Sequence, residues 1–131
     1  MQQRLSLTAI VVDDYDAAIA FYVGSLGFEL IEDMALGPDK RWVVVAPRGA
    51  PGGALLLAKA ADERQRARIG DQTGGRVFLF LETDDFQRDH AAYRARGVRF
   101  VEAPRYEAYG IVAVFEDLYG SRWDLIQRTV A

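Results

Sequence analysis

Hydrophobic and polar positions along the chain form two successions of the same pattern. The first begins with "LSLTAIVV", a short apolar and β-branched segment that predicts a strand. Asp13 and Asp14 follow it, and an Asp in front of an Ala-rich segment is typical of a helix N-terminus. Ala18, Phe21 and Tyr22 then recur at helical spacing. The pattern therefore predicts a strand and a helix that lies on a sheet through one apolar face.

Three more strands are predicted after this helix, which Gly27 is expected to end. "FELIED" alternates apolar and polar residues, "RWVVVAP" is almost continuously apolar, and "ALLLAKA" follows the Gly- and Pro-rich turn "RGAPGG". The next segment, "ADERQRARIGDQTGG", is polar and ends in glycines. We interpret residues 59–75 as a linker with one short helix near residues 63–69, whose charged face is solvated.

The same order returns in the second half of the chain. "RVFLFLE" predicts a strand, and "VRFVEAP", "IVAVFED" and "RWDLIQR" predict three strands after a helix. The acidic pair and the tyrosine of the first helix recur about 70 residues later as Asp84, Asp85 and Tyr93. An internal repeat of this kind indicates equivalent structural modules. Each half of the chain is therefore predicted to have the order β-α-β-β-β.

The fold class predicted from this repeat is α+β. We expect one domain over residues 1–131, built from equivalent modules at residues 5–58 and 76–128. A module of about 60 residues is marginal as an independent domain. Each module must therefore bury its apolar face against the other module or against another chain. The composition, half hydrophobic and 27% charged, supplies enough apolar residues for such a core.

Composition and charge exclude several classes of function. The net charge of −3 and the lack of a Lys/Arg cluster argue against a nucleic-acid partner. No apolar run approaches the roughly 18 residues that span a membrane, and Asp13 and Asp14 interrupt any signal-peptide-like segment. The chain has no cysteine, which excludes disulfides and thiolate chemistry and agrees with a cytoplasmic location. The single histidine, His90, is expected on the surface of the second helix.

Three segments, in order and at fixed spacing, carry a resemblance to a known superfamily. "IVVDDYDAAIAFYVGSLGFEL", "FLETDDF" and "FEDLYGSRWDLIQ" resemble the vicinal oxygen chelate superfamily of glyoxalase I, bleomycin-resistance proteins and extradiol dioxygenases. The last segment is similar to that superfamily's Asp-x-x-Gly-Asn-x-x-Glu-Leu hairpin, here Asp117, Gly120, Ser121, Asp124 and Leu125. The resemblance implies two βαβββ modules whose eight strands form a curved, half-open barrel. It also implies a homodimer whose chains share the ligand cavity.

The resemblance further implies a divalent metal on the concave face of that barrel in many members. The positions that match its ligands here are Leu7, Phe78, Asp124 and Leu56, or Leu55 if the register differs by one residue. Leucine and phenylalanine have no lone pair for a metal, and one carboxylate alone does not hold a divalent cation. We therefore expect no metal and no other cofactor.

Strand alternation predicts which side chains share the concave face with those positions. Phe78 brings Arg76 and Phe80 to that face, and Asp124 brings Arg122. The result is an apolar, aromatic floor with a few charged groups, which is typical of a small-molecule pocket. The alternative interpretation is that the aromatic side chains fill the barrel completely. The sequence leaves both open.

Two further features have a structural and a functional interpretation. Asp124 either forms an ion pair with Arg122 or Arg76, or acts as a general base or as the partner of a cationic ligand. Likewise Tyr109 in "PRYEAYG" lies either at a cavity mouth or in a solvated turn between strands. Trp42 and Trp123 are expected in the core rather than at a ligand.

Two functional hypotheses from different classes remain. The first is a binding protein, similar to the bleomycin-resistance branch, that holds an unknown small molecule without a metal. The second is a lyase, isomerase or dioxygenase of the same superfamily with a non-standard metal or acid–base site. In the second, Asp124 is the candidate catalytic residue. The candidate ligand contacts are Arg76, Phe78, Phe80, Arg122 and Tyr109.

Overall fold

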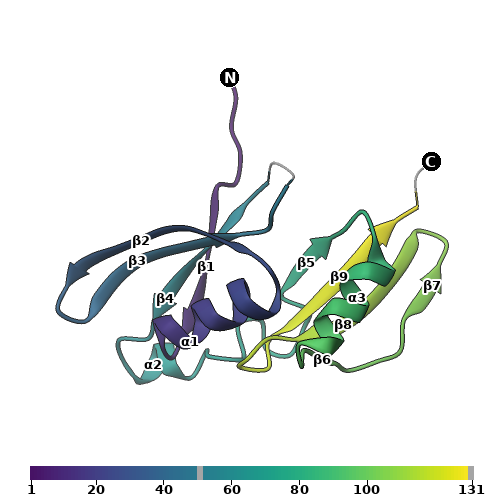
Figure 1. Ribbon diagram of the computed structural model, residues 1–131. Helices are drawn as coiled ribbons and strands as arrows, with labels where there is room; N and C mark the ends of the chain where they lie inside the picture. The colour runs from purple at the N-terminus through teal and green to yellow at the C-terminus, as the bar shows by residue number, and fades with distance from the viewer. Residues whose placement is uncertain (50–51, 130–131) are drawn as a thin grey trace. The chain divides into compact units, whose positions relative to one another are not determined.

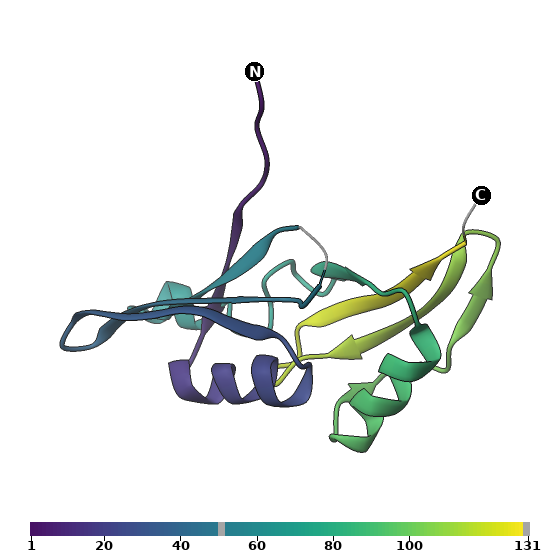
Figure 2. The same ribbon diagram turned by 45° about the horizontal axis from the view of Figure 1, so that its top comes forward.

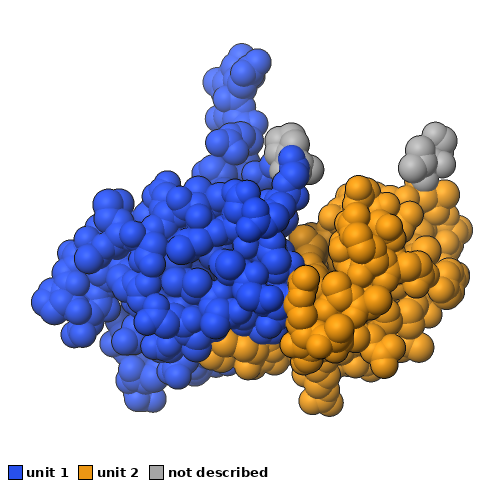
Figure 3. Space-filling model, viewed as in Figure 1, with its two compact units in different colours: residues 1–69 blue, residues 70–131 orange. Residues whose placement is uncertain are grey.

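The computed structural model describes residues 1–49 and 52–129, and it has the predicted α+β fold. The chain divides into two compact units, one of residues 1–69 and one that begins at Gly70 (Figure 3). Part of the predicted turn "RGAPGG", residues 50–51, lies outside the described residues. Each unit is an open sheet with a helix on one of its faces (Figure 1, Figure 2).

The first unit has a four-stranded sheet. Its elements are β1 (Leu7–Val12), α1 (Tyr15–Ile19), the π-helical η1 (Ala20–Ser25), β2 (Glu29–Gly37), β3 (Lys40–Ala46), β4 (Ala54–Lys59) and α2 (Glu63–Arg66). The strand order is β1-β4-β3-β2, with β1 parallel to β4 and the other neighbours antiparallel. The sheet therefore brings the first strand of the unit beside its last.

The predicted acidic cap starts the first helix. Asp14 accepts a hydrogen bond from the backbone N–H of Ala17 at 2.8 Å, as an N-cap residue does. The helix continues into η1, where the N–H of Leu26 donates to the carbonyl of Phe21, five residues back, at 3.0 Å. Ala18 and Tyr22 are fully buried on the face that meets the sheet.

The two faces of this sheet differ in burial. Residues on the helix side are buried, and they are Ile10, Val12, Val43, Val45, Leu55 and Leu57. Strand alternation puts Trp42 and Leu56 on the opposite face, where Leu56 stands between Val44 and Ala9 in register. Leu7 lies on that face as well and is 38% exposed. On the opposite face Val44 is buried, whereas Trp42, Leu56 and Leu7 keep part of their apolar surface exposed.

The second unit has a five-stranded sheet. Its elements are β5 (Leu79–Glu82), α3 (Phe86–Ala95), β6 (Arg99–Phe100), β7 (Arg105–Glu107), β8 (Gly110–Glu116) and β9 (Arg122–Arg128). The strand order is β5-β9-β8-β6, and β7 also pairs with β8. As in the first unit, the first strand lies parallel to the last, here β5 to β9.

The edge of this sheet differs from the prediction. The predicted strand "VRFVEAP" is ordered as a strand only at β6, and the predicted connection "PRYEAYG" forms β7 and a tight turn into β8. Both short strands pair with β8, Phe100 opposite Phe115 and Arg105 opposite Val112. Pro104, which has no N–H to donate, lies between them. The predicted edge strand is therefore divided into β6 and β7, and the described chain has nine strands instead of the predicted eight.

The core of the second unit is aromatic. Phe115 stacks on Trp123 with ring centroids 5.8 Å apart, and Phe86 and Tyr93 of α3 are buried over the sheet. His90 is not simply a surface residue as predicted. Its ring lies 5.3 Å from that of Phe86 and 4.4 Å from that of Phe100. This burial, with the charge of Arg94, lowers the pKa of His90.

No helix within the described ranges is long and apolar enough to cross a membrane.

Candidate functional site

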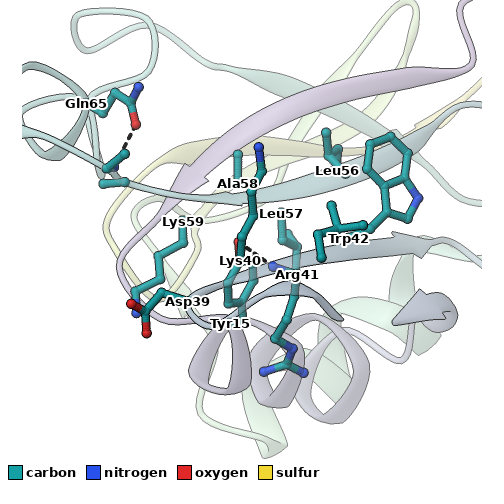
Figure 4. A pocket seen from close by; sticks show the side chains of 13 residues that line it. Tyr15, Asp39, Lys40, Arg41, Trp42, Leu56, Leu57, Ala58, Lys59 and Gln65 are labelled. Atoms are coloured by element: carbon teal, nitrogen blue, oxygen red, sulfur yellow. Dashed lines mark hydrogen bonds between the residues drawn. The ribbon is translucent and has the colours of Figure 1, made fainter. Parts of the chain in front are cut away.

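A cavity of about 720 Å³ opens in the first unit, where β3 begins and β4 ends (Figure 4). A volume of roughly 300–1,000 Å³ is usual for small-molecule pockets. Its lining residues come from α1, from the β2–β3 hairpin, and from β4 and the α2 segment after it. They are Tyr15, Leu36, Asp39, Lys40, Arg41, Trp42, Leu56, Leu57, Ala58, Lys59, Ala60, Ala61 and Gln65. The cavity is therefore large enough for a drug-sized molecule.

The apolar part of this cavity is formed by Trp42, Leu56 and Leu36. Figure 4 shows the indole of Trp42 beside the side chain of Leu56. Trp42 was expected in the core, but it is only half-buried and faces the cavity. Leu36 is 51% exposed, so half of its apolar surface is in contact with solvent. Covering these side chains with an apolar ligand would remove that surface from water, at about 25 cal/mol per Å².

The rim of the cavity is held in place by Arg41. Its guanidinium donates two hydrogen bonds to Asp33, at 3.1 and 2.7 Å, and one to Asp16 of α1, at 2.8 Å. The backbone N–H of Arg41 also donates to the hydroxyl of Tyr15, at 3.1 Å. The hydrogen bond from Arg41 lowers the pKa of Asp33. These contacts join the β2–β3 hairpin to α1, so the cavity has a fixed edge.

The polar part of the cavity contains groups of both charges. Lys40 and Lys59 line it, and within residues 1–49 and 52–129 neither ammonium group has a hydrogen bond or ion pair. Asp39 contributes a carboxylate from the turn of the hairpin. Gln65 is held by its side-chain oxygen, which accepts a hydrogen bond from the N–H of Ala61 at 2.7 Å. A few polar groups at the edge of an apolar pocket are the usual means of orienting a ligand.

The second unit has a polar cluster around Asp124, the candidate catalytic residue. Asp124 lies in the middle of β9, between Phe80 of β5 and Val114 of β8. Its Oδ1 atom is buried, and it has no hydrogen-bond partner among the residues that the structure describes. Burial raises the pKa of Asp124, while the positive charge of Arg105 lowers it and the negative charge of Glu102 raises it. A buried carboxylate oxygen without a hydrogen-bond donor is energetically costly.

Arg105 is the centre of this polar cluster. Its Nε atom donates to both carboxylate oxygens of Glu102, at 3.0 and 3.2 Å, and Nη1 donates to Glu107 at 3.3 Å. Glu102 also accepts from the backbone N–H of Val114 at 3.1 Å. Hydrogen bonds to Glu102 and then to Tyr109 raise the pKa of Arg105. The guanidinium therefore stays charged and is shared among several acceptors.

The residues predicted to contact a ligand differ in their position and exposure around Asp124. Phe80 is directly opposite Asp124 in register and is 67% exposed, so it does not pack into a core. The backbone N–H of Phe78 donates to the carbonyl of Arg122 at 2.7 Å, which extends the β5–β9 pairing by one step. Tyr109 lies in the turn before β8 and is 51% exposed. Arg76 is exposed in the segment before β5.

One prediction about Asp124 is wrong. An ion pair with Arg122 or Arg76 was one of its interpretations, but within the described ranges Asp124 forms no ion pair. The positive charge that acts on it belongs to Arg105. The reason is register, because Arg105 stands opposite Val112, and Val112 stands opposite Ile126, two residues from Asp124 on the same face. The pairing of β7 with β8, which the sequence did not predict, therefore brings Arg105 to the face of the sheet that carries Asp124.

The donor groups do not fit a divalent metal. Leu7, Leu56 and Phe78 are apolar, and Asp124 alone supplies a carboxylate at the four positions that the resemblance identifies. Among residues 1–49 and 52–129, no group of three or more His, Cys, Asp or Glu side chains is placed to hold a metal ion. We therefore derive no chemistry through a metal at these positions.

Sequence reasoning missed Arg105 and Glu102, although both lie in or beside a segment that it singled out. A hairpin reading of "PRYEAYGIVAVFED" would have found them, because Gly110 follows a short segment of alternating residues. That reading puts Arg105 and Glu107 on one face of a strand.

Comparisons of the sequence and of the structure with known proteins identify one superfamily. The family model described as "Glyoxalase/Bleomycin resistance protein/Dioxygenase superfamily" matches residues 4–125. An uncharacterized protein of Shewanella frigidimarina (strain NCIMB 400) is 56% identical over 128 residues, which are 97% of this chain and 95% of that protein. The crystal structure of UcmS2 is similar at 33% identity and a TM-score of 0.83, covering 96% of this chain and 98% of that one. The crystal structure of TnmS3, an antibiotic binding protein from Streptomyces sp. CB03234, is similar at 31% identity and a TM-score of 0.77, covering 98% of each chain.

Proposed function

We propose that this chain, which belongs to the Glyoxalase/Bleomycin resistance protein/Dioxygenase superfamily, binds a small organic ligand without a divalent metal. The observation that carries the proposal is the cavity of about 720 Å³ in the first unit, with Trp42, Leu36 and Leu56 on its apolar side. A rigid indole next to aliphatic side chains suits a planar, largely apolar molecule. Polar groups at the edge, Lys40 and Lys59 among them, then orient that molecule.

The comparisons support binding rather than a particular reaction. TnmS3, whose chain is 31% identical to this one, is described as an antibiotic binding protein. The donor set at the resemblance's metal positions, with Leu7, Leu56 and Phe78, is unsuited to Lewis-acid chemistry. A protein that sequesters an apolar compound needs a pocket of suitable volume and no reactive centre. The first unit meets that requirement.

A thermal-shift screen of planar aromatic compounds in excess EDTA tests the proposal. A compound that binds only the native state raises the melting temperature, and the rise grows with its concentration. We expect compounds that stabilise the wild-type protein in EDTA and lose that effect with Trp42→Ala. Tyr106→Ala, which removes an aromatic side chain that is 71% exposed and outside the cavity, is the matched control. If no compound stabilises the protein, or if Trp42→Ala binds as the wild type does, the proposal fails.

A second candidate function, acid–base catalysis at Asp124, is favoured by one specific observation. The Oδ1 atom of Asp124 is buried without a partner in the described residues, and burial raises the pKa of the carboxyl group. A raised carboxyl pKa is what a general acid or base at neutral pH requires. The test is to incubate each compound from the screen with wild-type protein and with Asp124→Asn, and to follow it by NMR. Turnover by the wild type alone supports catalysis, and an unchanged compound in both samples contradicts it.

We also propose that the chain forms a homodimer and acts in the cytoplasm. Support for the dimer comes from β2, an edge strand whose side chains are all exposed, with Leu30, Ile31, Met34 and Leu36 between 42% and 53% exposed. An exposed apolar edge strand readily pairs with another chain. Light scattering at micromolar concentration should give the mass of two chains, and a stable monomer would contradict the proposal.

The cytoplasmic location stays a prediction from the lack of cysteine.

A further inference from the structure

The pairing of β3 with β4 stops before either strand ends. The two strands are in register at three residue pairs, and the last of them toward the cavity is Val43 with Leu57. Both strands continue beyond this pair, but Arg41 and Lys59, two residues further on, are not paired in the described chain. Both of these residues line the cavity instead. The cavity therefore reaches into a gap between two neighbouring strands of the sheet.

The backbone of Lys59 presents a donor and an acceptor to this gap. On the other edge of β4, the N–H of Ala60 donates to the carbonyl of Val12 in β1 at 2.9 Å. Backbone groups of successive strand residues point to opposite edges, so the N–H and the C=O of Lys59 point toward β3. Among the described residues of β3, none is paired with Lys59. One N–H and one C=O of an extended residue are therefore directed into the cavity.

A side chain of α1 holds the gap open. The hydroxyl of Tyr15 accepts a hydrogen bond from the backbone N–H of Arg41 at 3.1 Å (Figure 4). If the antiparallel ladder continued, this N–H would donate to the carbonyl of Lys59. Tyr15 is only 7% exposed, so its ring is held in place by the packing of α1 on the sheet. The hydroxyl therefore replaces the strand partner of Arg41 and leaves Lys59 unpaired on that edge.

A planar carboxamide or lactam has the groups that match Lys59. Its N–H and C=O lie side by side, so it can donate to the carbonyl and accept from the N–H of one extended residue. Both backbone groups of Lys59 are then satisfied in a site from which the ligand excludes water. Trp42 and Leu56 line the same cavity and offer an apolar surface to the rest of the molecule. The polar and the apolar parts of the cavity together match an aromatic amide.

We propose that the backbone of Lys59 binds the N–H and C=O of an aromatic lactam or carboxamide, and that the hydroxyl of Tyr15 keeps this position open. The inference rests on the proposed function, because it names the ligand class of the same cavity. Tyr15 is a positioning residue, since it acts on Lys59 through the N–H of Arg41. Without the hydroxyl, Arg41 pairs with Lys59, and the ladder closes the gap that the ligand occupies.

Two planar probes that differ in one group test the ligand class. Isocarbostyril is a bicyclic lactam, and isocoumarin has the same shape with a ring oxygen in place of the N–H. Both are titrated into the whole wild-type chain in excess EDTA, by calorimetry and by NMR of the amide signals. We expect isocarbostyril to bind about tenfold or more tightly, because isocoumarin leaves the carbonyl of Lys59 without a donor. Isocarbostyril should also shift the amide signal of Lys59. Equal affinities, or an unshifted Lys59 signal, would overturn the inference.

Tyr15→Phe tests the positioning role, because it keeps the ring and removes the hydroxyl. The amide proton of Lys59 should then exchange with solvent about tenfold or more slowly, since it becomes part of the strand ladder. A nuclear Overhauser contact should appear between the α protons of Trp42 and Ala58, which antiparallel pairing brings together. The affinity for isocarbostyril should fall by about tenfold or more, because its hydrogen-bond partners are taken by Arg41.

Tyr106→Phe is the matched control for this variant. It removes a hydroxyl that lies 3.3 Å from the amide nitrogen of Gln87, outside the cavity. The exchange of the Lys59 amide proton and the affinity for isocarbostyril should both stay as in the wild type. Unchanged or faster exchange at Lys59 in Tyr15→Phe would overturn the inference, because a variant that merely loosens the structure does not form new strand pairs.

The outcomes distinguish this inference from the proposed function. Isocoumarin that binds as tightly as isocarbostyril, and loses its binding with Trp42→Ala, would refute the lactam class and still support the cavity as a ligand site. If Tyr15→Phe does not fold, the two probes and the Lys59 signal of the wild type decide, because they need no variant. Failure of every compound at Trp42 would contradict the inference and the proposed function together.

Discussion

Replacement of Glu102 is predicted to act on both stability and the acidity of Asp124. Glu102 has two roles that different variants separate. It accepts from Arg105 at 3.0 and 3.2 Å, and it accepts from the backbone N–H of Val114 at 3.1 Å. Glu102→Gln keeps an oxygen for Val114 and removes the charge. Glu102→Ala removes both contacts.

The structure sets the expected size of each effect. The side chains of Glu102 and Arg105 are 30% and 40% exposed, so solvent screens their attraction. Loss of such a pair costs about 0.5–1 kcal/mol, which is the range of partly exposed ion pairs. Glu102→Ala also leaves the N–H of Val114 without its acceptor, which adds about 1–1.5 kcal/mol. The free energy of unfolding should therefore fall by about 0.5–1 kcal/mol with Gln and by about 1.5–2.5 kcal/mol with Ala.

The acidity of Asp124 gives an independent measurement of the same contacts. The negative charge of Glu102 raises the pKa of Asp124, and the positive charge of Arg105 lowers it. Glu102→Gln removes the first effect and releases Arg105 from a competing carboxylate, so the pKa of Asp124 should fall. Urea unfolding measures the stability of each variant, and carbon-detected NMR titration measures the carboxyl pKa. An unchanged or higher Asp124 pKa in Glu102→Gln, or equal stabilities of the two variants, would refute the reasoning.

Three further predictions concern the second unit. Asp85→Ala removes the side chain that accepts from the N–H of Arg88 at 3.0 Å, and urea unfolding should show a loss of about 1 kcal/mol. Gly110→Ala puts a Cβ atom 2.2 Å from the carbonyl oxygen of Gln127, at a residue whose φ is +149°. Urea unfolding should therefore show that the free energy of unfolding falls by at least about 2 kcal/mol. Gly37→Ala is the control and should be nearly neutral, because its added Cβ atom meets nothing within 4 Å. The pKa of His90 is lowered in the folded protein, so the unfolded chain binds the proton more tightly, and stability should fall as the pH falls through the ordinary histidine range. His90→Gln should reduce this loss between pH 7.5 and 5.5, and an identical pH dependence of unfolding in both proteins would contradict it.

Local signals in the sequence predicted the element order and the helix starts. Both acidic pairs precede helices as expected, with Asp14 and Asp85 as the N-caps. A cap is a short-range interaction between a side chain and an N–H three residues later, so the sequence alone contains it. The apolar faces of the helices followed from the same kind of spacing, and Tyr22 and Tyr93 are buried as the repeat indicated.

The neighbours of Asp124 could not be predicted in the same way. They depend on the register of β8 against β9 and on the pairing of β7 with β8, contacts between residues that are distant along the chain. The apolar identity of Leu7 and Phe78 was visible in the sequence, and it is what argues against a metal at those positions. The cavity at Trp42 was not visible, because an indole in an apolar segment is equally typical of a core.

Direct binding to Trp42 in the absence of metal is the most decisive measurement. Trp42 and Trp123 are the two tryptophans of the chain, so a Trp123→Phe background leaves Trp42 as the single fluorescent reporter. A compound from the thermal-shift screen is titrated into this protein in excess EDTA, and its emission is followed. The account predicts a saturable change in the emission of Trp42 with the same dissociation constant with or without EDTA. No change in emission on saturation, or binding that disappears in EDTA and returns with a divalent cation, would contradict it.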